Sequence, residues 1–89
     1  MDASQQICRI SGSGSESQGT VVVCAPAGGS GVITAYDEHG RVAFHIHADA
    51  SGRNILNMTL QEGEYHLLYF SEPIGEGSQV YEGLLTVIA

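Results

Sequence analysis

Tryptophan and lysine are absent from this 89-residue chain, and three arginines stand against ten acidic residues, so the formal net charge is −7. Proteins that bind nucleic acid or anionic membranes need clustered cations to displace counterions from phosphates. Arg9, Arg41 and Arg53 are instead spread along the sequence. We therefore expect no nucleic-acid partner, and the acidic balance is typical of a small domain that its charge keeps in solution.

The sequence also lacks any apolar run close to the roughly 20 residues that span a bilayer, so no membrane insertion is expected. Its first residues, MDASQQ, have neither the basic nor the apolar region of a signal peptide. The chain is therefore either cytoplasmic or an exported protein from which the signal peptide has been removed.

No segment shows the three-to-four-residue apolar period of a helix, whereas several runs alternate with period two between Gly-rich or acidic turns. The predicted strands are, in chain order, residues 7–10, 20–25, 32–37, 41–48, 53–60, 64–71 and 80–88. This spacing predicts a single all-β domain over residues 1–89, an immunoglobulin-like antiparallel β-sandwich of about seven strands. Within it, residues 1–19 are predicted to be a short edge strand followed by a flexible Gly/Ser loop, SGSGSESQG.

Alternation also assigns side chains to faces. In residues 41–48 the predicted core positions are Val42, Phe44 and Ile46, and Ala43 belongs to the opposite face. In residues 64–71 both faces are partly apolar, which predicts a central strand. The two sets on that strand are Tyr65, Leu67 and Tyr69 on one face, and His66, Leu68 and Phe70 on the other.

The chain shares a sequence pattern with a known protein family in three segments: YDEHGR (36–41), LQEGEYHL (60–67) and VYEGLLTVI (80–88). In them the chain resembles small secreted immunoglobulin-like proteins of gut Bacteroidetes, a domain family of unknown function. The matching positions are Asp37, Gly40, Val42, Gly63, Tyr65, Leu67, Tyr81, Gly83, Leu85 and Val87, with Leu85 in place of an aromatic residue. The resemblance implies export, hence a secreted or periplasmic protein that has lost its signal peptide, and a non-enzymatic role. It supplies no ligand and no catalytic residue.

Three histidines form a candidate metal site. His45 and His47 project from one face of a predicted strand, roughly 6–7 Å apart, and His66 lies on another strand. Zinc or copper accepts imidazole ligands but needs three or four convergent groups. The alternative is a set of polar residues on a solvated sheet face, and for that reason we expect no cofactor.

Tyr36 and Tyr81 are candidate ligand-binding residues, because exposed aromatic rings on sheets stack on sugars or anchor protein interfaces. Cross-strand packing is the other interpretation. Cys8 and Cys24 could form a disulfide in an oxidising compartment or could both be small buried side chains.

No serine or cysteine has the positioned base that nucleophilic catalysis requires, so we expect a protein that is not an enzyme. The first hypothesis is a binding module for a protein or a glycan at the cell surface. The second is a structural protomer, a monomer or weak dimer that pairs edge to edge through residues 7–10 or 80–88. The third is a small metal-binding protein that uses His45, His47 and His66.

Overall fold

The structure is a computed structural model and describes residues 10–26, 30–71 and 80–89. The strands are β1 (Ser11–Ser15), β2 (Thr20–Cys24), β3 (Gly31–Tyr36), β4 (Val42–His47), β5 (Arg53–Leu56), β6 (Gly63–Ser71) and β7 (Val80–Ile88). The all-β prediction is confirmed. The described residues include no helix that could cross a membrane.

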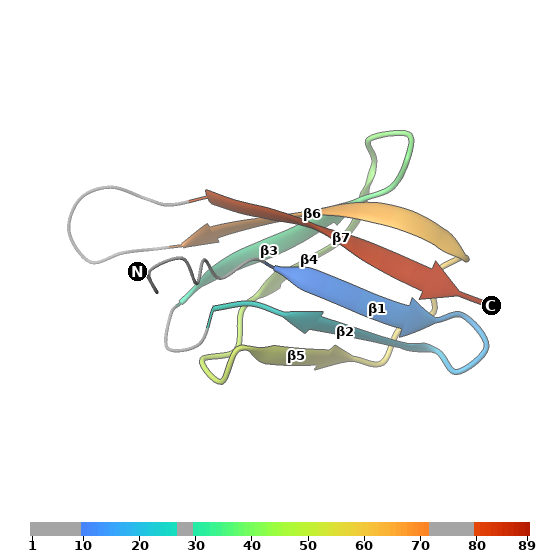
Figure 1. Cartoon of the computed structure of the whole chain (residues 1–89), viewed down its shortest axis with the longest axis horizontal. Coiled ribbons are helices and arrows are strands. Elements are labelled where there is room, and N and C mark those ends of the chain that lie inside the picture. The colour runs from blue at the N-terminus through green and yellow to red at the C-terminus, as the bar shows by residue number, and fades with distance from the viewer. Residues whose placement is uncertain (1–9, 27–29, 72–79) are drawn as a thin grey trace, which may run out of the picture.

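The seven strands form one hydrogen-bonded sheet in the order β4-β3-β6-β7-β1-β2-β5. Neighbours are antiparallel except β1 and β7, which run parallel. The sheet is strongly curled, and in Figure 1 β4, at one end of the strand order, crosses behind the front strands. The two separate sheets of the predicted sandwich are therefore not confirmed, because one mixed sheet surrounds the core as a half-barrel.

The Gly/Ser segment is the clearest departure from the sequence analysis. Residues 11–15, predicted as part of a flexible loop, form β1 between β7 and β2. A Cβ added to Gly12 would lie 3.0 Å from Leu85 Cδ1, and one added to Gly14 would lie 3.1 Å from Val21 Cγ2, so both glycines face the core. Missing side chains on this inner face let the sheet bend sharply at β1. Residues 7–9 of the predicted first strand lie outside the described residues.

The core fills the inside of the curled sheet. Its buried residues are Ile10, Val21, Val23, Ile33, Ala35, Phe44, Tyr65, Leu67, Tyr69, Leu85 and Val87. The two-face assignment on β6 is confirmed, with the Tyr65 face inside, and β6 is central as predicted. The core contains residues of β4, near one end of the sheet, and of β2, near the other. One curled sheet can therefore bury a core without a second layer.

The face assignment on β4 is wrong at its start. A bulge lies between Ala35 and Tyr36 of β3, where Ala35 pairs with Phe44 but Tyr36 pairs with Val42. The extra residue, Ala43, packs against the core, and Val42 is 57% exposed. A bulge adds one residue to one strand and so reverses its alternation, which a period-two pattern cannot anticipate.

The predicted edges also change. Val80–Ile88 pairs with β6 on one side, and its second half, residues 85–88, also pairs with β1 on the other. Among the described strands the sheet ends at β4 and β5. Residues 85–88 are therefore unavailable for edge pairing, since the backbone of this part of β7 is hydrogen-bonded on both sides within the sheet.

Candidate functional site

The outward-facing surface of β4, β3, β6 and β7 is the most unusual surface among the described residues. Each of these strands buries alternate residues in the core, so the intervening residues point outward. The large apolar side chains exposed there are Val42, Phe70, Val80, Leu84 and, at the end of β7, Ile88, at 42–61% exposure. We call this surface the outer face.

Strand register arranges the outer face in three rows that run across the four strands. From β4 to β7 the rows are His47-Val32-Phe70-Val80, His45-Thr34-Leu68-Glu82 and Val42-Tyr36-His66-Leu84. These twelve residues define the outer face. Seven of them are apolar or aromatic, and Glu82 is the one acid among them in a chain that carries ten. The face is thus a nearly acid-free apolar patch on an acidic domain.

Two polar contacts lie on the outer face. Thr34 Oγ1 is 2.9 Å from His45 Nδ1, which satisfies the buried threonine hydroxyl and holds the imidazole over β3. His66 Nε2 lies 3.5 Å from Glu82 Oε1, with both side chains more than half exposed. An exposed pair of this kind contributes little to stability. The two contacts instead determine the positions of the His45 and His66 side chains among the apolar side chains of the outer face.

The structure places all three candidate metal ligands on the outer face but does not bring them together. His45 and His47 share β4, while His66 lies on β6 with β3 between them, roughly 10 Å away at the usual strand spacing. Within the described ranges, no group of three or more His, Cys, Asp or Glu side chains is positioned to hold a metal ion. The arrangement fits dispersed imidazoles on a solvated sheet face better than a zinc site.

The two candidate tyrosines lie on opposite sides of the sheet. Tyr36 is half-buried in the third row of the outer face. Tyr81 packs inward against buried Tyr69, with ring centroids 5.6 Å apart and planes tilted by 34°. Tyr81 is therefore part of the core boundary, as the cross-strand packing interpretation holds. Tyr36 remains the candidate for ligand contact.

Cys24 is exposed at the end of β2. Cys8 lies outside the described residues, so the disulfide stays a prediction.

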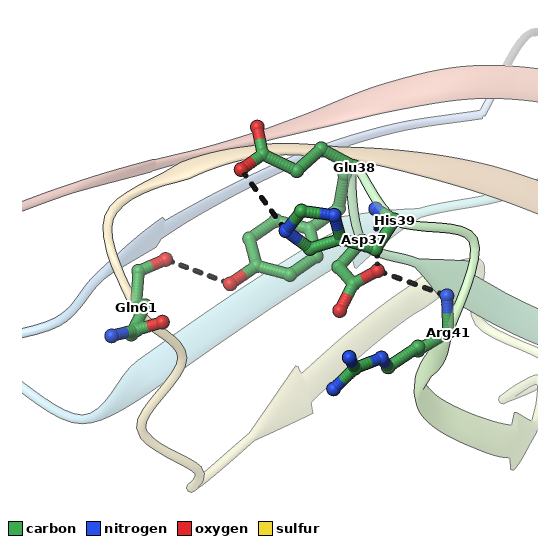
Figure 2. Close-up of polar contacts among 6 residues, drawn as sticks. Asp37, Glu38, His39, Arg41 and Gln61 are labelled. Atoms are coloured by element: carbon green, nitrogen blue, oxygen red, sulfur yellow. Dashed lines mark hydrogen bonds and ion pairs between the residues drawn. The ribbon is translucent and has the colours of Figure 1, made fainter.

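The β3–β4 turn has its own polar network, shown in Figure 2. Asp37 Oδ1 accepts backbone N–H bonds from His39 at 2.8 Å and from Arg41 at 2.9 Å. Gly40 takes a positive φ of 78°, which suits glycine in a tight turn. The turn borders a hollow of about 130 Å³ whose walls include Glu62, Glu64 and Tyr65. This acidic hollow contains no second feature that indicates a ligand, and we assign it a structural role.

This turn gives a pH prediction. The Arg41 backbone N–H, above all, lowers the pKa of Asp37 below its ordinary value of 3.8. Because the folded pKa is lower than the unfolded one, the stabilisation is present above the unfolded value and is lost as the pH falls through the folded value. Urea unfolding between about pH 5 and pH 2 should therefore show a smaller loss of stability for Asp37→Asn than for the wild type. Glu38→Gln, the control, should follow the wild type, and parallel curves for all three proteins would contradict the assignment.

Sequence reasoning missed the outer face as a unit. Two features of the sequence indicated this surface. In residues 64–71 the face opposite Tyr65 also carries apolar side chains, Leu68 and Phe70. In residues 80–88, Val80 and Leu84 project from the opposite face to Leu85 and Val87. Knowing that these residues form one surface required the strand order β4-β3-β6-β7.

The chain matches no protein-family model, no curated protein and no solved structure.

Proposed function

We propose that this chain is a non-enzymatic interaction module that binds a protein surface through the outer face of β4, β3, β6 and β7. The observation that carries the proposal is that Val42, Phe70, Val80 and Leu84, each at least 42% exposed, all lie on this one face of the sheet. Contiguous exposed apolar patches on small domains mark interaction sites, because water contact with that area is unfavourable.

The composition of the face favours a protein over a glycan. Tyr36 and Phe70 are its two aromatic residues, and aliphatic side chains surround them in all three rows. Aliphatic groups cannot hydrogen-bond to sugar hydroxyls, whereas apolar residues interspersed with a few polar ones are typical of protein interfaces. Tyr81, the other candidate for sugar stacking, is turned inward.

We further propose that the fold is an immunoglobulin-like sandwich in which β1 joins the two halves. The four strands β4-β3-β6-β7 and the pair β2-β5 would be its two sheets, with β1 parallel to β7 and antiparallel to β2. The chain crosses between the halves from β2 to β3, from β4 to β5 and from β5 to β6, as in Greek-key sandwiches. On the sequence resemblance alone, we propose a location outside the cytoplasm, secreted or periplasmic.

A retention experiment tests the proposed function. The wild type, a Leu84→Ser variant and an Ile55→Ser variant would be immobilised and exposed to surface proteins of the cells that produce the chain. Ile55 is 61% exposed on β5, away from the outer face, and so is a matched control for Leu84 at 56%. We expect the amount of protein retained by the wild type and by Ile55→Ser to fall at least about tenfold with Leu84→Ser, as for an interface residue that loses its apolar contact. Equal retention by all three would contradict the proposal.

The glycan alternative makes a different prediction. If Tyr36 stacks on a sugar, electrophoresis through gels that contain cell-surface polysaccharide should retard the wild type but not Tyr36→Ala. Far-UV circular dichroism would check that the variant is folded. Retardation that the substitution leaves unchanged would reject stacking at Tyr36, and no retardation of either protein would favour the protein partner.

Edge pairing is the second candidate function, and the position of β4 at the end of the sheet favours it. Among the described strands, one side of β4 is hydrogen-bonded to β3, and the other side faces away from the sheet. The backbone groups on such an edge can template a further strand. Amide hydrogen exchange separates the two candidates: edge pairing predicts that protection rises with protein concentration selectively for the β4 amides that point away from β3, and binding through the outer face does not.

A further inference from the structure

We propose that the protein partner of the outer face is a second copy of this chain, packed face to face about a two-fold axis parallel to the strands. This inference rests on the proposed function, because it names the occupant of the same surface. It comes from how the three rows match themselves under that rotation.

A two-fold axis along the strands, midway between β3 and β6, places β4 of one copy over β7 of the other and keeps each row opposite itself. In the middle row, His45 then faces Glu82 of the second copy, and the same pair recurs on the other side of the axis. When the Thr34 hydroxyl donates to His45 Nδ1, the proton of that imidazole is on Nε2, which can donate to a carboxylate. Each polar end of the row thus meets a suitable partner.

The remaining positions of the face are also compatible. In the first row Val32 faces Phe70, and in the third row Val42 faces Leu84. Apolar groups therefore meet apolar groups at four symmetric places, which removes their exposed area from water. At the ends of the first row His47 faces Val80, and at the centre of the third row Tyr36 faces His66. At the centre of the middle row Thr34, whose hydroxyl already contacts His45, faces Leu68. Side chains with an apolar body and a polar tip tolerate such positions.

The other face-to-face rotation is unfavourable. An axis across the strands would place β4 over β4 and β7 over β7, so that Glu82 faces Glu82 and His45 faces His45. Two carboxylates brought together in a partly dehydrated contact repel each other. The charges of the middle row therefore select the axis along the strands.

The size of the face sets the expected strength. Four strands and three rows form a patch of roughly 19 Å by 20 Å, or about 400 Å², compared with about 800 Å² per partner in a stable complex. We therefore expect a weak dimer that forms at high concentration, with a dissociation constant on the order of 10–500 μM.

Complementary charge reversal tests the arrangement. His45→Glu places two carboxylates opposite each other in its homodimer, and Glu82→Arg removes the acceptor from its own. Sedimentation velocity over a concentration series should show that each variant dimerises at least about tenfold more weakly than the wild type. In a mixture of the two variants, the introduced glutamate of one copy would face the introduced arginine of the other, and the unchanged His45 would face the unchanged Glu82. The mixed dimer should therefore return to within about threefold of the wild-type affinity.

The controls separate this inference from the proposed function. Ile55→Ser should dimerise like the wild type, and Leu84→Ser should not dimerise, with circular dichroism confirming that both are folded. A wild type that stays monomeric up to about 1 mM, or a mixture no stronger than its parents, would overturn the second-copy inference. The retention experiment decides the proposed function independently, because a different protein retained through Leu84 would uphold the face as a binding site without self-association.

Discussion

Replacement of Gly83 by alanine is expected to destabilise the domain by about 3 kcal/mol or more. Gly83 lies on the inner side of β7, and a Cβ built there would overlap the carbonyl oxygen and carbon of Ile10. Backbone atoms cannot rotate away as a flexible side chain can, so either Ile10 or β7 has to move. Ile10 is itself almost fully buried in the core, which makes that movement costly.

Urea unfolding followed by circular dichroism measures this effect, with Thr86→Ala as the control. Thr86 is an exposed residue of the same strand, so its substitution should change the unfolding free energy by less than about 1 kcal/mol. An 89-residue domain has a total stability of roughly 4–13 kcal/mol, so the loss in Gly83→Ala would be a large fraction of it. A variant as stable as Thr86→Ala would show that Ile10 does not pack over Gly83 of β7.

The second large effect is expected on β6. Leu67 is fully buried, and Leu68 is half-buried on the opposite side of the same strand. Leu67→Ala removes three carbons' worth of packing from the core and leaves a cavity, at a cost of about 3 kcal/mol. Leu68→Ala removes the same atoms from a partly solvated position and should cost about 1 kcal/mol.

This pair is a matched comparison, because the residue type, the strand and the substitution are the same. The difference in unfolding free energy therefore measures burial alone. A cost for Leu68→Ala equal to or above that for Leu67→Ala would place the core on the wrong side of β6 and would remove the outer face as described.

The pattern of residues predicted the strands well where the information is local. Alternation identified β3, β6 and β7 closely, and the turn at Asp37 with Gly40 was evident from its residue types. It failed for β1, because SGSGS has the composition of a flexible linker and has few side chains to reveal a face. The reason it forms a strand is tertiary: β7 and β2 supply hydrogen-bond partners on both sides.

The candidate site was less predictable, for two physical reasons. His45, His47 and Tyr36 were identified from sequence, but their shared surface depends on strand order, which is a long-range property. The bulge at Ala43 then moves Val42 from the predicted core to the outer face. Period-two reasoning applies only up to such an insertion. Tyr81 points inward because it lies on the same face of its strand as the core residues Leu85 and Val87. The alternation of residues 80–88 already indicated this orientation.

Site-specific photo-crosslinking in the producing cells tests most directly the claim that the outer face contacts a partner. The photoreactive residue p-benzoylphenylalanine would replace Leu84 in one variant and Ile55 in another, since both side chains are exposed to a similar degree on different parts of the sheet. We predict a discrete cross-linked product from position 84 and none from position 55, with mass spectrometry of the product identifying the partner. No product from position 84, or equal products from both positions, would contradict the assignment of the outer face as the interaction surface.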